Sequence, residues 1–395
     1  MKNKFYVSAI YTSPPGTMGG NTKILIEIIN NLSDKFDFVI FTTEPKAFQI
    51  NLKDISKVKI ISIAYTFKKF SYISHYSEIR YITKIYHEYF SKNKISKDDY
   101  FISPSDFAPD VLPIYFLKKQ YSFKWIASLF LFMPNPLENL VKKYEFPFVK
   151  YIIYFLYQRA LFRKMLERAD LFLITNDYDR KYFPKKFKER IFAIYGGVNV
   201  EEIGKAKKES DGKKLYDAVF CSRLHPQKGI SQLLDVWATV IKEIPTAKLA
   251  IIGNGEDSYE RFLREKAKKL KVDKNVKWLG YINGVNKYKI YLQSKMFLHG
   301  TIYDNNGMVA AEALCSGLPV IMYDLPQLKN VYKEGCIKIP LGDKKKFSEG
   351  IIKELVKDSI GRLSYARIDK LLSYWSWEHR VREFMIFLYN MIIFR

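Results

Sequence analysis

The chain has 395 residues, 48% of them hydrophobic and 27% charged, and this composition excludes an intrinsically disordered protein. A single hydrophobic core seldom grows beyond about 250 to 300 residues, so the length predicts two domains. The net charge of +24 predicts an anionic partner: a phosphate-bearing substrate, an acidic membrane surface or nucleic acid. The three cysteines (Cys221, Cys315 and Cys336) are too few and too scattered for a disulfide framework or a zinc site, which indicates a reducing compartment.

The amino terminus, MKNKFYVSAIYTSPPG, starts with basic residues, but Pro14 and Pro15 break its apolar run too early for a secretion signal. We interpret this segment as a first strand. No segment offers the roughly 18 uninterrupted apolar residues needed to cross a bilayer, because Lys150 and Arg159 interrupt the best candidate. The sequence therefore predicts a cytoplasmic protein, and it leaves open a peripheral position at the inner face of the cell membrane.

Short apolar runs recur along the chain, and helical or loop stretches separate them. Near-continuous apolar strands that alternate with helices predict parallel sheets covered on both faces. In the first half we assign the strands 5–10, 36–41, 58–63, 125–132 and 171–174. The same alternation restarts in the second half, with strands at 218–220, 249–252, 276–279, 296–298, 319–322 and 336–339. The fold class is therefore α/β, with two sheets.

Between the two halves, residues 201–214 (EEIGKAKKESDGKK) are highly charged and lack apolar periodicity, which is typical of an exposed linker. Near the end of the chain, Ser376 can cap a helix whose Val381, Phe384 and Leu388 fall on one face. We therefore divide the chain into an N-terminal Rossmann-like domain (1–200), a linker (201–214), a second Rossmann-like domain (215–375) and a C-terminal helix (376–395).

Residues 297–324, FLHGTIYDNNGMVAAEALCSGLPVIMYD, predict a strand, a glycine loop, a helix and a buried strand in succession. Asp304 and Glu312 are eight positions apart, and Gly307 lies between them, just before the helix. A helix N-terminus can hold a phosphate with its free N–H groups, while neighbouring carboxylates accept hydrogen bonds from sugar hydroxyls. We therefore expect a nucleotide-sugar site here. His299 either lines this site or packs against the neighbouring strand.

A second group of candidates lies in FCSRLHPQKG (220–229), where Arg223 and Lys228 follow a strand in the loop before a helix. Ligands of open α/β sheets bind beyond the carboxyl ends of the strands, and two cations there can neutralise a diphosphate. Taken alone, two basic residues in a loop are more often simply solvated. Arg223 and Lys228 become candidates for a ligand site because other loops have the same position: Gly253 and Gly255 also follow a strand.

This ordered series of loops resembles the C-terminal domain of the retaining GT-B glycosyltransferases of family 4, the glycosyl transferases group 1. In that family an Arg-x4-Lys-Gly element, a glycine turn and an acid-x7-Glu element follow one another in this order. The resemblance extends through residues 19–22, 193–199 and 375–377 and so covers nearly the whole chain. It implies a GT-B architecture, in which two Rossmann-like parallel-sheet domains face a cleft and the C-terminal helix returns to the N-terminal domain.

The resemblance also implies roles for single residues. Arg223 and Lys228 would hold the donor diphosphate, and Asp304 would grip the donor sugar, which makes these three the catalytic candidates. Glu312 would bind the ribose hydroxyls. The other residues implied in donor binding are the glycines Gly19, Gly20, Gly253 and Gly255, the base-reading Tyr281 and Ile282, and the phosphate cradle of Gly307, Met308 and Val309. No metal ion and no cofactor is implied, because the nucleotide sugar is itself a substrate.

Two features depart from the family pattern. Asp304 stands where the family more often has glutamate, and its side chain is one methylene shorter. Family members also usually place a histidine after a strand that resembles 125–132, whereas this chain has Phe130, Leu131 and Phe132 there. We therefore assign no catalytic histidine.

The implied reaction is transfer of a hexose from a nucleotide-diphosphate sugar to a glycan or lipid-linked acceptor, with retention at the anomeric carbon and without a protein nucleophile. An alternative is a GT-B-like sugar-nucleotide epimerase or phosphorylase, which needs no separate acceptor. A more remote alternative is a basic nucleic-acid-binding protein, which the charge and the many aromatics suggest. Against it, the aromatics sit mostly within apolar runs, so we expect no nucleic-acid partner.

Residues 144–168 mix aromatic and basic side chains, a combination that is typical of a helix at an anionic membrane surface. On one helix, Lys150 and Arg168 would share a face while Arg159 and Arg163 lie roughly opposite, so the apolar stripe is not clean. Contact with a membrane and a core helix with solvated arginines both stay open.

Overall fold

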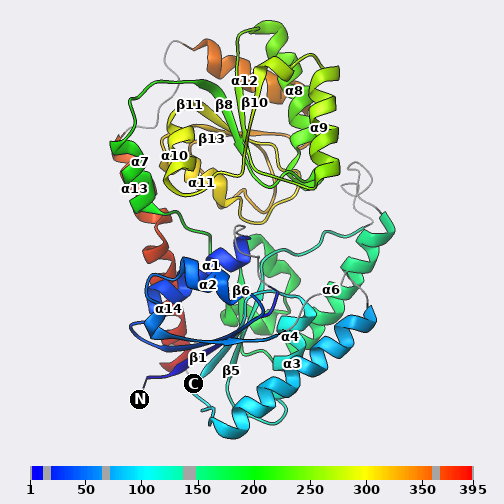
Figure 1. Ribbon diagram of the computed structural model, residues 1–395, viewed down its shortest axis with the longest axis vertical. Helices are drawn as coiled ribbons and strands as arrows, with labels where there is room; N and C mark the ends of the chain where they lie inside the picture. Colours follow the sequence, from blue (N-terminus) through cyan, green and yellow to red (C-terminus); the bar gives the residue numbers. More distant parts are fainter. Residues whose placement is uncertain (1, 12–18, 65–71, 137–147, 358–364, 394–395) are drawn as a thin grey trace. The chain divides into compact units, whose positions relative to one another are not determined.

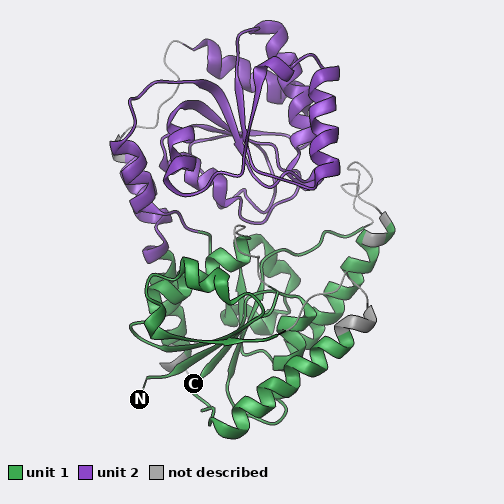
Figure 2. Cartoon of the chain, in the orientation of Figure 1, with its two compact units in different colours: residues 1–143, 147–196, 380–395 green, residues 144–146, 197–379 purple. Residues whose placement is uncertain are grey.

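The computed structural model describes residues 2–11, 19–64, 72–136, 148–357 and 365–393. The chain divides into two compact units (Figure 2). The first unit comprises Met1–Lys143, Pro147–Gly196 and Arg380–Arg395, and the second comprises Tyr144–Phe146 and Gly197–His379. Among the described residues, no helix is both long enough and apolar enough to span a bilayer.

The first unit is built on a seven-stranded parallel sheet with the strand order β3-β2-β1-β4-β5-β6-β7 (Figure 1). Its strands are β1 (Lys4–Ala9), β2 (Asp37–Thr42), β3 (Val58–Ser62), β4 (Tyr100–Ser103), β5 (Lys124–Leu129), β6 (Leu171–Ile174) and β7 (Ile191–Ala193). Its helices are α1 (Gly20–Leu32), α2 (Pro45–Asn51), α3 (Tyr72–Lys92), α4 (Ala108–Leu117), α6 (Phe148–Arg168) and most of α14 (Trp377–Ile393). Strands β4 and β6 are buried at every position, as expected for a sheet covered on both faces.

The second unit is built on a six-stranded parallel sheet with the order β10-β9-β8-β11-β12-β13. Its strands are β8 (Tyr216–Cys221), β9 (Leu249–Ile252), β10 (Val276–Gly280), β11 (Ser294–His299), β12 (Val320–Tyr323) and β13 (Cys336–Ile339). Its helices are α7 (Val200–Lys208), α8 (Ile230–Glu243), α9 (Asp257–Lys269), α10 (Gly284–Leu292), α11 (Met308–Cys315), α12 (Lys344–Val356) and α13 (Tyr365–Trp375). The predicted α/β class with two Rossmann-like sheets is confirmed.

Each sheet has one point at which the strand order reverses. From β1 the chain moves outward to β2 and β3 and then crosses to β4, which pairs with β1 on its other side. From β8 it moves to β9 and β10 and then crosses to β11, which pairs with β8. The loops that leave two such neighbouring strands run in opposite directions and open a crevice at their carboxyl ends, where α/β sheets bind ligands. Each unit therefore offers one such switch point.

The C-terminal helix α14 begins as predicted, because Ser376 Oγ accepts a hydrogen bond from the N–H of His379 at 3.2 Å. From Arg380 onward the helix belongs to the first unit, although the second unit precedes it in the sequence. Within that unit, the rings of Phe384 and Phe192 pack with their centroids 5.6 Å apart. The C-terminal helix thus returns to the N-terminal part of the chain.

The predicted linker at 201–214 is wrong in its first part, which forms α7. The Asn199 side chain accepts a hydrogen bond from the N–H of Glu202 at 3.1 Å and so caps this helix. Ile203 and Ala206, three positions apart, bury one narrow face of an otherwise charged helix. Glutamates in the first turn and lysines in the last turn also complement the helix dipole. Between α7 and β8, residues 209–215 have neither helix nor strand.

Gly229 allows the loop after β8 to approach the loop after β11. Its φ of +67° lies in the left-handed region, and a Cβ atom at this position would overlap the carbonyl oxygen of Gly300. Two hydrogen bonds fix the approach. The N–H of Ile302 donates to the Gln227 carbonyl at 3.1 Å, and Gln227 Nε2 donates to the Tyr303 carbonyl at 2.7 Å. Any larger residue at position 229 would push these two loops apart.

We expect Gly229→Ala to lower the urea midpoint of unfolding and to cost about 2 kcal/mol or more, because the left-handed conformation alone costs alanine roughly 1–2 kcal/mol. The matched control is Gly204→Ala in α7, where an added Cβ has no neighbour within 4 Å. This control should be neutral or stabilising by up to about 1 kcal/mol, since alanine is the better helix former. Equal midpoints for the two variants would contradict the close approach of the loops.

Candidate functional site

The predicted donor residues of the second unit lie at one edge of its sheet, in the loops that follow the strands and in helix α11. The strands are parallel, and β10, β9, β8 and β11 are consecutive neighbours, so the loops that follow them emerge side by side. These loops carry Tyr281 and Ile282 after β10, Gly253 and Gly255 after β9, Arg223 and Lys228 after β8, and Asp304 and Gly307 after β11; Met308, Val309 and Glu312 follow in helix α11. Gly19 and Gly20 lie in the first unit, where Gly19 is the N-cap residue of α1.

The glycine turn after β9 packs tightly against the loop that carries Arg223. Gly253 has a φ of +133°, and a Cβ atom there would overlap the carbonyl oxygen of Ser222. The N–H of Leu224 donates to the Asn254 carbonyl at 2.8 Å. Gly253 and Gly255, which are predicted to bind the donor, therefore also allow the loop after β9 to pack against the loop after β8.

Asp304 connects the loop after β8 to the loop after β11. Its Oδ2 accepts a hydrogen bond from Lys228 Nζ at 2.8 Å and lies 3.6 Å from Nε2 of His299. Its Oδ1 accepts hydrogen bonds from the N–H groups of Asn305 at 2.9 Å and Gly307 at 3.3 Å. Burial raises the pKa of this carboxyl, but Lys228 and His299 outweigh burial and hold the pKa well below its usual range. Asp304 is therefore an anion with both oxygens engaged.

Helix α11 begins at Met308, directly after Gly307, which has a φ of +59°. The phosphate cradle predicted from the N–H groups of Gly307, Met308 and Val309 is narrower than expected, because Asp304 occupies the first of them. Within the described residues, the N–H groups of Met308 and Val309 meet no acceptor. These two groups and the positive end of the helix dipole remain available to an anion.

Glu312, on α11, is held by two side chains of α10. Its Oε1 accepts hydrogen bonds from Lys287 Nζ at 2.7 Å and from the Tyr288 hydroxyl at 3.3 Å. Burial lowers the pKa of Lys287, but the negative charge of Glu312 outweighs burial, so the pKa is raised. Glu312 Oε2 is buried and has no hydrogen-bond partner in the described part of the chain. An unsatisfied carboxylate oxygen is costly, so a hydroxyl donor would be favoured there.

Lys287 and Tyr288 were missed in the sequence. One feature of the sequence could have indicated them. Tyr288 and Tyr291 lie on one face of the helix that follows the predicted base-reading residues Tyr281 and Ile282. In the sequence alone, a lysine next to that face cannot be told from a solvated residue. Only the fold shows that Lys287 reaches the carboxylate of a neighbouring helix.

Arg223 is exposed, and among the described residues its guanidinium has no ion-pair partner. It nevertheless acts on its neighbour His225. Burial, followed by the positive charges of Arg223 and Lys228, lowers the pKa of His225 to about 4. His225 is therefore neutral at physiological pH, and its Nδ1 accepts a hydrogen bond from the N–H of Gln227 at 3.2 Å. The free positive charge at this edge comes from Arg223.

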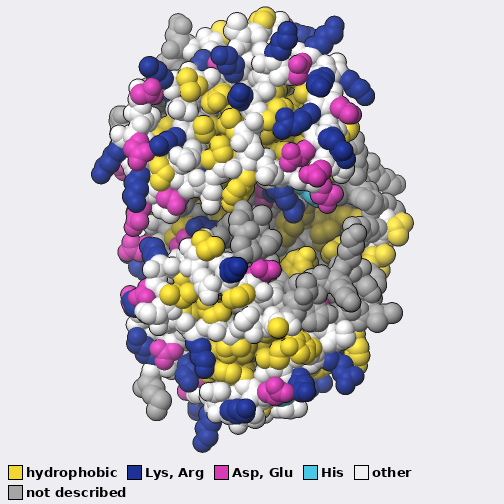
Figure 3. All heavy atoms as spheres, viewed as in Figure 1, with side chains coloured by type: hydrophobic (Ala, Val, Ile, Leu, Met, Phe, Trp, Pro, Cys, Tyr) yellow, Lys and Arg dark blue, Asp and Glu magenta, His cyan; other side chains and the backbone are white. Residues whose placement is uncertain are grey.

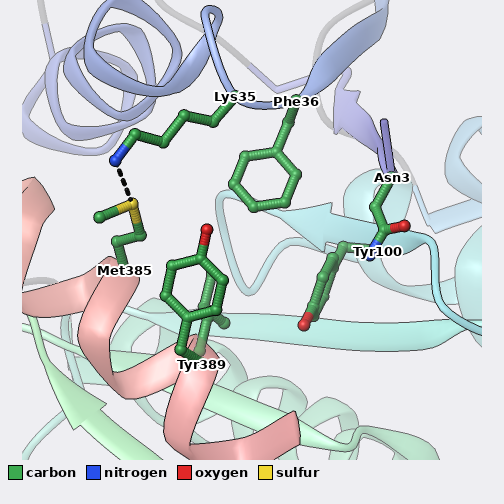
Figure 4. A pocket seen from close by; sticks show the side chains of 7 residues that line it. Asn3, Lys35, Phe36, Tyr100, Met385 and Tyr389 are labelled. Carbon is green, nitrogen blue, oxygen red and sulfur yellow. Dashed lines mark hydrogen bonds between the residues drawn. The ribbon is translucent and has the colours of Figure 1, made fainter. Parts of the chain in front are cut away.

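A cavity of about 190 Å³ lies in the first unit, away from the carboxyl ends of its strands (Figure 4). It is lined by Asn3, Lys35, Phe36, Tyr100, Met385, Leu388 and Tyr389. Lys35 Nζ lies 3.0 Å from the Met385 sulfur, which is a weak acceptor. The cavity is smaller than the roughly 300–1,000 Å³ of ligand pockets, so we do not assign a substrate to it.

The distribution of charged side chains bears on the alternative of a nucleic-acid-binding protein and on the question of a metal site. On the face shown in Figure 3, lysine and arginine side chains are dispersed and acidic side chains lie between them. The described residues of this face therefore form no continuous basic stripe of the kind that binds nucleic acid. No group of three or more histidine, cysteine or acidic side chains that could hold a metal ion occurs among the described residues.

Comparison with known proteins shows what this chain is similar to. Residues 201–369 match the family model for glycosyl transferases group 1. An uncharacterized glycosyltransferase of Methanocaldococcus jannaschii is 28% identical over 158 residues, which cover 37% of this chain and 39% of the relative. The phosphatidyl-myo-inositol mannosyltransferase of Mycobacterium leprae is 26% identical over 191 residues, covering 47% of this chain and 50% of the relative. The matched region thus spans half or less of the length of these two relatives.

Solved structures resemble the chain over its full length. The sucrose-phosphate synthase of Thermosynechococcus elongatus has a TM-score of 0.79 at 15% identity and covers 99% of both chains. Anabaena HepE, solved in complex with UDP and glucose, has a TM-score of 0.70 at 14% identity, and the likeness covers 98% of this chain and 99% of HepE. Residues 201–369 are therefore similar to the glycosyl transferases group 1, and the two Rossmann-like units have the GT-B fold.

Proposed function

We propose that this protein transfers a hexose from a nucleotide-diphosphate sugar to a hydroxyl of a glycan or lipid-linked acceptor, with retention at the anomeric carbon. The observation that carries the proposal is the switch point between β8 and β11. The segments that follow these neighbouring strands carry Lys228 and four groups without a partner in the described part of the chain: the guanidinium of Arg223, the N–H groups of Met308 and Val309, and one oxygen of Glu312. The complex of HepE with UDP and glucose and the match to a lipid-modifying mannosyltransferase support the same substrate classes.

The diphosphate leaving group would be stabilised by Arg223, Lys228 and the N–H groups of Met308 and Val309. Such donors are already in place before the reaction, so they need little reorganisation when negative charge develops on the leaving phosphate. In this proposal the cations carry the role that a metal ion has in other transferases, and no resident metal is required. Asp304 keeps Lys228 in position through its 2.8 Å contact.

The ribose of the donor would be bound by Glu312. Lys287 and Tyr288 both donate to Oε1 and so fix the rotamer of the carboxylate, which leaves Oε2 to accept from ribose hydroxyls. Tyr281 and Ile282, which follow the edge strand β10, stay the candidates for contact with the base. A contact between Asp304 and the donor sugar remains a prediction from the family resemblance.

The hydrogen bonds and the low pKa of Asp304 agree with retention without a protein nucleophile. Its two oxygens already accept hydrogen bonds from Lys228 and from the backbone, and its pKa is held well below the usual range. A carboxylate stabilised in this way is a weak nucleophile. We therefore propose that the acceptor hydroxyl attacks from the face that the diphosphate leaves.

An epimerase or phosphorylase would use the same type of donor site, but the named relatives are transferases. The products separate the two classes, because a transferase forms a glycoside only when an acceptor is present. Nucleic-acid binding has no specific observation in its favour.

A peripheral membrane position is part of the proposal, and α6 supports it. Val149, Ile153 and Leu156 follow one another at spacings of four and three, and their exposed fractions are 70%, 41% and 61%. The basic side chains of α6 are less available to anionic lipid than the sequence suggested. Arg159 lies 4.9 Å from the ring centre of Tyr182, and Lys164 pairs with Glu167. We therefore propose that apolar insertion, rather than charge alone, would bring α6 to a membrane.

The donor site is tested by calorimetric titration of UDP, GDP and ADP into the wild type and into Glu312→Gln. We expect one nucleotide to bind the wild type and to lose roughly 10- to 100-fold in affinity in the variant, since hydrogen bonds to a charged group contribute about 1.5–3 kcal/mol. Glu349→Gln, an exposed residue on α12 of the same unit, is the control and should bind as the wild type does. Equal affinity in wild type and Glu312→Gln would remove Glu312 from the site.

The role of Arg223 is tested by kinetics. Because the guanidinium has no partner within the described chain, Arg223→Ala should leave the melting temperature unchanged and lower kcat by about 100-fold or more, the size of effect seen when one donor to a developing anion is removed. The wild type should keep its rate in EDTA, and NMR of the glycoside product should show the anomeric configuration of the donor. A rate unchanged in Arg223→Ala, or abolished by EDTA, would contradict the proposed stabilisation by protein cations.

Membrane contact is tested by sedimentation with vesicles of phosphatidylglycerol. The double variant Val149→Asp, Leu156→Asp should bind at least tenfold more weakly than the wild type, since each buried apolar side chain contributes about 1.5–3 kcal/mol. Ile50→Asp, at an exposed position of α2 in the same unit, is the matched control. Wild-type protein that stays in the supernatant at low salt would rule out this part of the proposal.

A further inference from the structure

Tyr332 is a buried tyrosine of the second unit that the donor chemistry described so far does not use. It lies between β12 and β13, and only 1% of it is exposed. Burial, against a smaller opposing contribution from the N–H of Ala311, raises the pKa of Tyr332 well above its usual range, so the hydroxyl keeps its proton. A buried hydroxyl needs an acceptor for that proton, because an unpaired donor in the interior costs free energy. The acceptors of Tyr332 lie in the loop before α11.

The hydroxyl of Tyr332 lies on the carbonyl side of two successive peptide units. Its oxygen is 2.8 Å from the carbonyl oxygen of Asn306 and 2.7 Å from that of Gly307. Because a hydroxyl has a single proton, the two carbonyls share it. The two peptide units are Asn306–Gly307 and Gly307–Met308, which lead directly into α11. Tyr332 therefore contacts the loop at the point where the helix begins.

The positions of the two carbonyls determine where the N–H groups of the same peptide units point. A trans peptide unit is planar, so its C=O and its N–H point in opposite directions. Both carbonyls face Tyr332, and both N–H groups therefore face away from it. The N–H of Gly307 donates to Asp304 Oδ1 at 3.3 Å. The N–H of Met308 meets no acceptor within the described residues and is one of the two groups available to the donor diphosphate.

Gly307 makes this loop depend on such support. Its φ of +59° lies in the left-handed region, which glycine adopts without strain, but the missing side chain also leaves the neighbouring peptide planes easy to rotate. The carbonyl of Gly307 accepts a second hydrogen bond, from the N–H of Ala310 at 2.7 Å. The carbonyl of Asn306 has no donor other than Tyr332 among the described residues. The hydroxyl of Tyr332 is thus the contact that the two peptide units have in common.

The ring of Tyr332 is itself held in place. It stacks on the ring of Trp375, with the centroids 5.4 Å apart and the planes 17° from parallel. Trp375 is buried, and its carbonyl accepts a hydrogen bond from the N–H of Val198 at 2.8 Å. The backbone N–H of Tyr332 donates to the carbonyl of Leu328 at 3.0 Å. All of these residues belong to the second unit, so the hydroxyl has a fixed position relative to α11.

We propose that Tyr332 is a positioning residue for the donor diphosphate: through the carbonyls of Asn306 and Gly307, it directs the N–H of Met308 toward a phosphate oxygen. This inference rests on the proposed function, and it adds a residue from outside the loops that follow β8 and β11. Tyr332 does not touch the donor, because it is buried on the other side of the loop. An N–H that already points at the phosphate stabilises negative charge better than one that must first rotate.

The test is an NMR titration of the full-length wild type and of Tyr332→Phe, which keeps the stacked ring and removes only the hydroxyl. The ligands are UDP, GDP and ADP and the corresponding nucleosides. We expect the variant to bind the diphosphate about three- to tenfold more weakly, the size of effect that one neutral hydrogen bond has. Nucleoside binding should stay unchanged, because Tyr332 supports only the phosphate part of the site. The control is Tyr323→Phe, a buried tyrosine of β12 that packs on Phe347, and it should bind as the wild type does.

A second readout separates positioning from a purely structural role. In the wild type, the amide proton of Met308 should shift downfield when the diphosphate binds, because its N–H then donates to a phosphate oxygen. In Tyr332→Phe at saturating diphosphate this shift should be smaller, since the peptide unit is no longer held in one orientation. A tyrosine kept for stability alone would lower the melting temperature when replaced and would leave the shift of Met308 unchanged.

Equal diphosphate affinity in wild type and Tyr332→Phe, an equal loss for diphosphate and nucleoside, or an unchanged Met308 shift would each overturn the inference. Should Tyr332→Phe fail to fold, the wild type decides: the hydroxyl proton of Tyr332 should exchange with water more slowly when diphosphate is bound, and an unchanged rate would contradict the role. Failure here differs from failure of the proposed function. A wild type that binds no nucleotide contradicts both, whereas nucleotide binding that is insensitive to Tyr332→Phe removes Tyr332 alone.

Discussion

The carboxylate of Asp304 holds together the two loops on which the donor site depends. One oxygen accepts from Lys228 and the other from the backbone at the start of α11, so the cation, the loop and the helix N-terminus have fixed relative positions. Breaking a buried ion pair by removing one partner typically costs about 3–5 kcal/mol, because the remaining charge is left unpaired. The arrangement therefore makes Lys228 a rigid donor rather than a mobile surface lysine.

Helix α11 is fixed a second time through Glu312, which is bound to Lys287 and Tyr288 of α10. The first turn of α11 and its middle are thus anchored to different elements of the second unit. Three groups near these anchors have no hydrogen-bond partner among the described residues: the N–H groups of Met308 and Val309 and the Oε2 atom of Glu312. Rigid anchors beside unsatisfied donors and acceptors favour binding with little loss of conformational freedom.

Much of the fold could be predicted because its strands are short, apolar and buried on both faces. All six strands of the second sheet were found in this way, whereas β4 and β7 of the first sheet were missed. The donor loops could be predicted because each follows such a strand. The linker prediction failed at α7, where two small buried positions, Ile203 and Ala206, are enough to fix a helix that looks entirely charged. Lys287 and the duties of Asp304 could not be predicted, since they depend on which loops meet in space.

If the start of α11 holds the donor diphosphate, a bound nucleotide should protect the amides there, and hydrogen–deuterium exchange measured residue by residue by NMR detects this protection. A panel of UDP, GDP and ADP would be added to the full-length protein, and amide exchange would be compared with and without nucleotide. We expect one nucleotide to slow exchange at the amides of Met308 and Val309 and of the loop that contains Arg223 and Lys228. Nucleotide binding that leaves these amides unprotected would contradict it.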